Sequence, residues 1–519
     1  AIAQNRRPKL VVNIVVGSMR ASDLERYADG FGEGGFKRLM REGATFTDAE
    51  YDYALTSTEA GIATFVTGAL PSVHGVVGRS WWSHTDGSSQ DIIADRKSHP
   101  VPFSTGSISC SPYRLQAPTL GDMVVDGIAG SKQITVAIEP YSAIVMNGHK
   151  GVAYWVERNK THWTTSSAYL SEIPAWVSIY NSENVNDYYR LKRWEPKGNI
   201  ANYKNSEVAV VEGIKGKTTK LLSNVNLHLA STSYGHMCYT PAGNNMLLEF
   251  ASQALVQERL GADAATDVLN ICLDTPRYIA ETYGPESIEY EDMLYRLDAT
   301  IAEFLKVVDV CYPNQRDYLI VLTADHGMGH SNTSPNRELN NFNTRQAEVI
   351  LNAFLSAQYG QGSWVLSFDD GAIYLNRDLV YAKKLSIAQV QNEAATFAMQ
   401  LRGVANAATA TALQGGAMSN LSSRLMQNTF YPRRSGDILY TLQPDYTELD
   451  DDNIAQSGSP YNYDRHIPLI FYGCGIPNGV IDRKVSSTAI AVTEASLLGI
   501  SRPDCSDGEV IYELIKIKK

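Results

Sequence analysis

The stretch DYLIVLTADHG, residues 317–327, decides the fold and points to the site. It is an apolar run that ends in an Asp, a His and a Gly, which is typical of a fully buried parallel strand that stops at a loop. The runs KLVVNIVVG (9–17) and HIPLIFYGCG (466–475) have the same form, and helical patterns such as SIEYEDMLYRLDATIAEFLKVV (287–308) lie between them.

This alternation predicts an α/β fold with a doubly wound, mostly parallel sheet flanked by helices. Ligands of such sheets bind beyond the carboxyl ends of the strands, so residues 17, 323–326 and 466 are expected along one edge. Two stretches break the alternation and predict inserted cap regions. The expected organisation is a core of residues 8–150, 246–345 and 446–519, a cap insertion at 151–245 rich in Tyr and Trp, and a second insertion or subdomain at 346–445.

Charge and hydropathy exclude some classes of function. The 519-residue chain has a net charge of -11, which argues against nonspecific binding to nucleic acid or to an anionic membrane. Its apolar runs fall short of the roughly 20 residues that a transmembrane helix needs. The first residues, AIAQN, resemble the remnant of a signal-peptidase site, so we expect an exported protein, periplasmic or extracellular.

A second candidate segment is TSTEAG, residues 56–61, just before an expected helix. One interpretation is a capping box, in which Thr56 caps the helix and Glu59 follows three residues later. The other makes Thr58 a nucleophile at a helix N-terminus, where the dipole and the free N–H groups favour an anion. The segment alone favours the cap.

The order of six segments is more specific. They are KLVVNIVVGSMR (9–20), the stretch from GEGGFKRL to SVHGVVG (32–78), YGPESIEYEDMLYRLD (283–298), TADHG (323–327), RRSGDILYTLQPDY (433–446) and GSPYNYDRHIPLIFYGCGI (458–476). Together they resemble the alkaline phosphatase superfamily, and most of all the bacterial phosphatases of the PafA type, which use a threonine nucleophile. The resemblance runs from about residue 8 to the C-terminus.

The resemblance implies a site for phosphoryl transfer in which two zinc ions about 4 Å apart hold the attacking and leaving oxygens. It places the nucleophile at Thr58. Asp325 and His326 are then ligands of the zinc beside the nucleophile, and His466 is a ligand of the other zinc.

Several positions depart from the family pattern. Gly17 stands where the family has an Asp that closes the first strand. Arg277 and Glu281 stand where it has an Asp and a His that bind the other zinc. Arg79 replaces an Asn that follows the HG motif.

A Lys-x-Arg pair of the family falls on Glu139 and Tyr141, which removes two cations that would contact phosphoryl oxygens. The guanidinium of Arg277 would also repel a zinc ion at its side. We therefore expect Arg277 to pair with Asp325 or Glu281, and the site to hold no zinc or at most one zinc ion.

Two functions are compatible with this altered site. The first is a pseudoenzyme that binds an unidentified protein or small-molecule ligand, and we favour it because fold alone does not supply activity. The alternative is an active phosphate-ester hydrolase with a rebuilt one-metal site, in which Thr58 is the nucleophile and Arg79 and Arg277 stabilise the oxyanion. A sulfatase is disfavoured, because TSTEAG lacks the C/S-x-P-x-R pattern of sulfatases in this superfamily.

Overall fold

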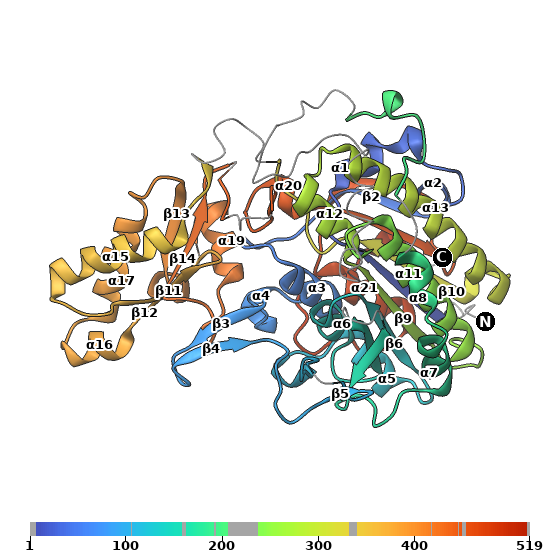
Figure 1. The fold of residues 1–519 in the computed structure, drawn as a ribbon, viewed down its shortest axis with the longest axis horizontal. Helices are drawn as coiled ribbons and strands as arrows, with labels where there is room; N and C mark the ends of the chain where they lie inside the picture. The colour runs from blue at the N-terminus through green and yellow to red at the C-terminus, as the bar shows by residue number, and fades with distance from the viewer. Residues whose placement is uncertain are drawn as a thin grey trace.

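A ten-stranded sheet forms the centre of the molecule, in the order β16-β2-β15-β10-β1-β9-β6-β7-β8-β5 (Figure 1). The structure is a computed structural model that describes residues 7–515 except 105, 158–161, 191–193, 206–236, 332–339, 417, 445 and 449–452. The AIAQN segment and part of the expected cap lie outside the described residues. The strands are β1 (Leu10–Val16), β2 (Ala44–Glu50), β5 (Pro100–Val101), β6 (Gln133–Ala137), β7 (Val152–Glu157), β8 (His162–Ser166), β9 (Asp267–Leu273), β10 (Tyr318–Thr323), β15 (His466–Gly473) and β16 (Gly479–Ser486).

The five central strands, β10, β1, β9, β6 and β7, are parallel to one another. Every residue of β1, β9 and β10 is buried, as their continuous apolar sequences predict. β15 runs antiparallel to both β10 and β2. The predicted α/β fold with a mostly parallel sheet is confirmed.

Helices cover both faces of this sheet (Figure 1). One group consists of α3 (Thr58–Thr67), α5 (Leu120–Gly127), α6 (Pro140–Asn147) and α21 (Ala489–Leu498), and the other of α2 (Phe36–Glu42), α11 (Pro241–Gln257), α12 (Thr275–Tyr283) and α13 (Ile288–Cys311). None of the described helices combines the length and the apolar character needed to cross a membrane.

A second sheet lies beside the core, at the left of Figure 1, and we call its region the four-stranded subdomain. Its antiparallel strands lie in the order β11-β12-β14-β13. They are β11 (Val365–Asp369), β12 (Ala372–Leu375), β13 (Val404–Thr409) and β14 (Ile438–Leu442), with α15 (Thr344–Tyr359) and α17 (Ile387–Ala398) packed against them. This region has a hydrophobic core of its own around Trp364. The hairpin of β3 (Ser80–Ser83) and β4 (Ser88–Asp91) extends from the main domain toward it (Figure 1).

Part of the expected cap, 151–245, belongs instead to the central sheet. β7 and β8 fall inside this range and extend the sheet toward β5. The aromatic residues that suggested a cap are buried there: Tyr154 and Trp155 lie on β7, and Trp163 of β8 stacks on Phe250 with ring centroids 4.0 Å apart. The strand alternation was hidden because both faces of these strands bury large rings.

Candidate active site

The carboxyl ends of β1, β9 and β10 meet at one edge of the sheet, because the three strands are parallel neighbours. The residues that follow them therefore lie close together. The N–H of Ser18, just after β1, donates to Asp325 Oδ1 at 2.8 Å, and the N–H of Gly17 donates to the carbonyl of Leu273 at 2.9 Å. The segment TADHG is thus held in place by backbone groups of the adjacent strand.

Helix α3 brings Thr58 to this edge. Ser57 caps the helix by accepting a hydrogen bond from the N–H of Ala60, so Thr58 is its first residue. Thr56, the cap in the sequence-based interpretation, accepts instead from the N–H of Gly458. A Cβ on Gly61 would lie 1.8 Å from the carbonyl oxygen of Asp325, so only glycine allows α3 to pack this closely on the strand end.

Thr58, Asp325 and His326 form one buried group, which we call the retained trio. His326 Nε2 lies 3.3 Å from Thr58 Oγ1 and 3.5 Å from Asp325 Oδ2. His326 Nδ1 lies 2.6 Å from the carbonyl oxygen of Gly327, which requires a proton on Nδ1; in the neutral ring Nε2 is then an acceptor. Asp325 Oδ2 is buried and has no hydrogen-bond partner among the described residues.

The retained trio fits one metal ion. A tetrahedral zinc about 2.0–2.1 Å from each ligand separates its ligand atoms by about 3.3–3.4 Å, close to the distances from His326 Nε2. A buried carboxylate oxygen without a partner is costly, and a cation would remove that cost. Thr58, Asp325 and His326 would hold the ion through two oxygens and one nitrogen, with water as a fourth ligand.

The expected ligands of the other zinc do not assemble. His466, expected at the site, begins β15 and its Nε2 lies 2.8 Å from the carbonyl oxygen of Thr47 on β2. It is not among the described residues that line the cleft, so its placement in the site is corrected. Gly17 has no room for a carboxylate, because a Cβ there would lie 2.9 Å from the Leu273 carbonyl and 3.1 Å from the Cβ of Arg277.

The other substituted positions are joined by ion pairs, which we call the arginine network. Arg79 Nε lies 3.0 Å from Glu59 Oε1, and Arg79 Nη2 lies 2.8 Å from Glu139 Oε2. The same oxygen of Glu139 lies 3.2 Å from Arg277 Nη2, and Arg277 Nη1 lies 3.5 Å from Glu281 Oε1. Of the two partners expected for Arg277, Glu281 is therefore the one that it contacts.

Two further residues complete the arginine network. The guanidinium of Arg79 lies 4.0 Å from the ring centroid of Tyr141, so the tyrosine that replaces a family cation supports a new one by a cation–π contact. Asp274, which follows β9, accepts from the N–H groups of Ile138 and Glu139 and lies 3.8 Å from Arg277 Nη2. The sequence interpretation missed Asp274, and it treated Glu59 only as part of a helix cap.

Burial and the ion pairs together set the charge states of this network. Burial alone would lower the pKa of Arg277, but Glu281 and Glu139 raise it well above its ordinary value, so the guanidinium stays charged. Burial raises the pKa of Asp274 to about 6, with a further contribution from Glu139. Burial also raises the pKa of Glu281, which Arg277 partly offsets.

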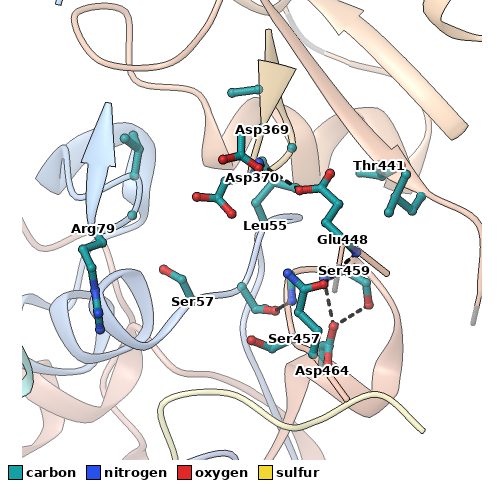
Figure 2. Close-up of a pocket in the computed structure, with 18 of the residues that line it drawn as sticks. Leu55, Ser57, Arg79, Asp369, Asp370, Thr441, Glu448, Ser457, Ser459 and Asp464 are labelled. Atoms are coloured by element: carbon teal, nitrogen blue, oxygen red, sulfur yellow. Dashed lines mark hydrogen bonds between the residues drawn. The ribbon is translucent and has the colours of Figure 1, made fainter. Parts of the chain in front are cut away.

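A cleft of about 590 Å³ connects the retained trio and the arginine network with the four-stranded subdomain. Figure 2 shows Asp369, Asp370 and Glu448 grouped together in this cleft, away from Arg79. Carboxylate oxygens of these three acidic residues lie within 4.8 Å of one another. Asp369 is the last residue of β11, Asp370 follows it in the hairpin turn, and Glu448 lies in the segment after β14. The sequence offered no recognisable motif at these positions.

Asp464 is a fourth acidic residue of the cleft that the interpretation missed, although the GSPYNYD motif contains it. Its Oδ2 accepts from the N–H and the hydroxyl of Ser459, while its buried Oδ1 has no hydrogen-bond partner in the part of the chain that the structure describes. Burial raises the pKa of Asp464 to about 6, and the nearby His326 lowers it in part.

Comparisons of the sequence and the fold with known proteins identify relatives of this chain. A family model for type I phosphodiesterase / nucleotide pyrophosphatase matches residues 11–464. Alkaline phosphatase PafA of Elizabethkingia meningoseptica is 30% identical over 98% of this chain and 95% of its own length. Alkaline phosphatase PhoV of Synechococcus elongatus is 29% identical over 98% of this chain and 93% of its own.

The crystal structure of wild-type PafA has a TM-score of 0.90 to this chain at 28% identity, and the match covers 98% of this chain and 99% of that one. The family model covers most of the sequence, and the sequence relatives cover nearly all of it. The chain therefore belongs to the type I phosphodiesterase / nucleotide pyrophosphatase family of the alkaline phosphatase superfamily.

Proposed function

We propose that this chain is a pseudoenzyme of its superfamily, which has lost two-zinc phosphoryl transfer and binds a ligand or a protein segment in its cleft. The observation that carries the proposal is the arginine network. Both guanidinium groups of the site, those of Arg79 and Arg277, already have carboxylate partners, and they share Glu139.

A phosphoryl group in transfer spreads negative charge over its oxygens and needs cations or hydrogen-bond donors around them. The network contains four carboxyl groups and only two guanidinium groups; the carboxyl groups are those of Glu59, Glu139, Asp274 and Glu281. Glu139 stands where the resemblance places a cation. This part of the site therefore opposes a phosphate dianion.

The second metal position is equally unfavourable. Arg277 and Glu281 occupy two positions that the resemblance assigns to its ligands, and His466 contacts Thr47 instead. A charged guanidinium beside a dication is repulsive, and one carboxylate does not make a zinc site. A clamp of two ions about 4 Å apart is not available to this chain.

The test combines metal content with turnover. Protein purified without chelator is analysed by ICP-MS and assayed with p-nitrophenyl phosphate under added zinc, with the PafA relative as the active control. We expect less than one zinc per chain and no turnover above that of the Thr58→Ala variant. Two zinc ions per chain, with turnover that requires Thr58, would overturn the proposal.

The retained trio favours a second candidate, a phosphate-ester hydrolase with one zinc. Its support is the unpartnered Asp325 Oδ2 together with the distances of 3.3 and 3.5 Å at His326. A bound zinc would lower the pKa of the Thr58 hydroxyl and make it a nucleophile. One zinc per chain, with turnover that the Thr58→Ala variant lacks, would establish this candidate in place of the pseudoenzyme.

A further inference from the structure

The charge of the cleft indicates which class of ligand it takes. Among its described lining residues, the carboxylates outnumber the guanidinium groups six to two. The acidic residues are Glu59, Glu281, Asp369, Asp370, Glu448 and Asp464, and the arginines are Arg79 and Arg277. Without Asp369 and Asp370, four carboxyl groups still face two arginines.

The two arginines do not neutralise the remaining acids. Their ion pairs all lie within the arginine network, with Glu59, Glu139, Asp274 and Glu281. Glu448 instead receives hydrogen bonds from uncharged donors, the hydroxyl of Tyr440 and the N–H of Asp370. These hydrogen bonds bring no positive charge to the side of the cleft that faces the subdomain.

Asp464 gives an independent indication on the other side of the cleft. It lines the cleft, only 1% of its surface is exposed, and its Oδ1 lacks a hydrogen-bond partner among the described residues. A buried carboxylate oxygen without a partner is costly, and a cation placed in the cleft would remove that cost. Burial raises the pKa of Glu448 to about 8, so this second carboxyl is also held without a compensating charge.

Aromatic side chains supply the rest of a site for an organic cation. Trp82, Tyr374, Tyr446 and Tyr463 line the same cleft. The faces of such rings attract ammonium groups, and the effect grows when water is excluded. A cleft of about 590 Å³ is also far larger than a single metal ion requires.

We propose that the cleft binds a small organic polycation through protonated amino groups, with Glu448 and Asp464 as two of its carboxylate partners. This inference rests on the proposed binding function and names its ligand class. Binding would ionise Glu448, whose carboxyl group is protonated in the free protein at pH 7, so a proton would be released to the buffer.

The experiment is isothermal titration calorimetry of the full chain at pH 7 with spermidine, calcium chloride or inorganic phosphate as the probe. Each titration is repeated in two buffers of different ionisation enthalpy. We expect spermidine to bind with one site per chain and with proton release. Glu448→Gln should weaken the binding by on the order of tenfold, because a charged hydrogen bond is lost.

The matched control is Glu303→Gln, an exposed residue of α13 that pairs with Lys306 outside the cleft, and it should leave the affinity unchanged. If Glu448→Gln does not fold, Asp369→Asn at the exposed end of β11 replaces it. Calcium binding without spermidine binding would overturn the amine assignment, as would equal losses in the Glu448 and Glu303 variants. Phosphate turnover that requires Thr58 would instead defeat the proposed function, whatever spermidine does.

Discussion

The retained trio and the arginine network lie side by side, yet they solve the problem of buried charge in different ways. In the arginine network, carboxylates are paired with guanidinium groups of the chain itself, as at Glu139 with Arg79 and Arg277. In the retained trio, Asp325 Oδ2 has no such partner among the described residues. In one region the guanidinium groups of the chain supply the positive charge, while in the other the ligand atoms at His326 are spaced as a metal ion requires.

The comparison also shows why the retained trio keeps its geometry. Asp325 is held by backbone N–H groups of Ser18 and His326, and α3 is fixed on its carbonyl through Gly61. The arginine network depends instead on long side chains that hold one another. Removing one of its cations should therefore cost more than removing one member of the trio.

Arg277→Ala should have the largest effect. It leaves Glu139, Glu281 and Asp274 without the guanidinium that their buried carboxylates share, and breaking such a pair costs about 3–5 kcal/mol. Urea unfolding at pH 7 measures the change in the free energy of unfolding. Arg316→Ala, at an exposed position, is the control and should change it by about 0.5 kcal/mol or less. A loss below about 1 kcal/mol for Arg277→Ala would show that the network is not a structural unit.

Asp464→Asn should reveal a buried carboxyl without a cation. The folded pKa of Asp464, about 6, lies above the ordinary value of 3.8, so the folded chain holds a proton that the unfolded chain releases. This contribution to stability is complete below pH 3.8 and is lost as the pH rises through about 6. Across that window the wild type should lose on the order of 3 kcal/mol relative to the variant.

The measurement is urea unfolding of both proteins at several values of pH. Glu494→Gln is a useful parallel, because burial raises the pKa of that residue from 4.5 to about 8 and it is not among the described lining residues of the cleft. Its effect should appear at higher pH than that of Asp464→Asn. Identical pH profiles for the wild type and Asp464→Asn would contradict the assignment of a neutral carboxyl at this position.

Gly17→Ala tests whether the end of β1 has room for a side chain. The new Cβ would press on the Leu273 carbonyl and on the Cβ of Arg277, which should cost about 1–3 kcal/mol. Gly127→Ala, at the end of α5, is a matched control, since its Cβ would meet only an ordinary contact of 3.8 Å with Ile500. Thermal unfolding of both variants gives the comparison. Equal melting temperatures would show that position 17 has room for a side chain.

The sequence was most informative where chain direction and residue type agree. The apolar runs before Gly17 and Asp325 are strands, and parallel neighbours necessarily end at the same edge. Thr58 was harder, because a capped helix and a nucleophile have the same local pattern. Only the close approach of Gly61 to the Asp325 carbonyl shows that the first turn of α3, and with it Thr58, lies at the end of β10.

Side-chain direction was beyond the sequence. His466 begins an antiparallel strand, and its ring turns to the Thr47 carbonyl of the adjacent strand, which no spacing could show. The pairing of Arg79 with Glu59 joins residues that the sequence assigned to a phosphate position and to a helix cap. Asp369 and Glu448 belong to the four-stranded subdomain, whose position over the site depends on packing rather than on any motif.

Thr58→Ala should have the smallest effect on stability, and it separates the two regions most directly. The contact from Thr58 Oγ1 to His326 Nε2 is 3.3 Å long, so its loss should cost about 0.5–1.5 kcal/mol in the absence of metal.

With zinc in excess, thermal unfolding distinguishes two outcomes. If the trio binds an ion, zinc raises the melting temperature of the wild type more than that of Thr58→Ala, because the variant loses one oxygen ligand. If zinc leaves the melting temperature of the wild type unchanged but raises that of Arg277→Ala, the arginine network is the region that keeps metal out. An equal response of wild type and Thr58→Ala would mean that the donor geometry at Asp325 and His326 no longer selects a metal, and that even the retained region has become part of a binding surface.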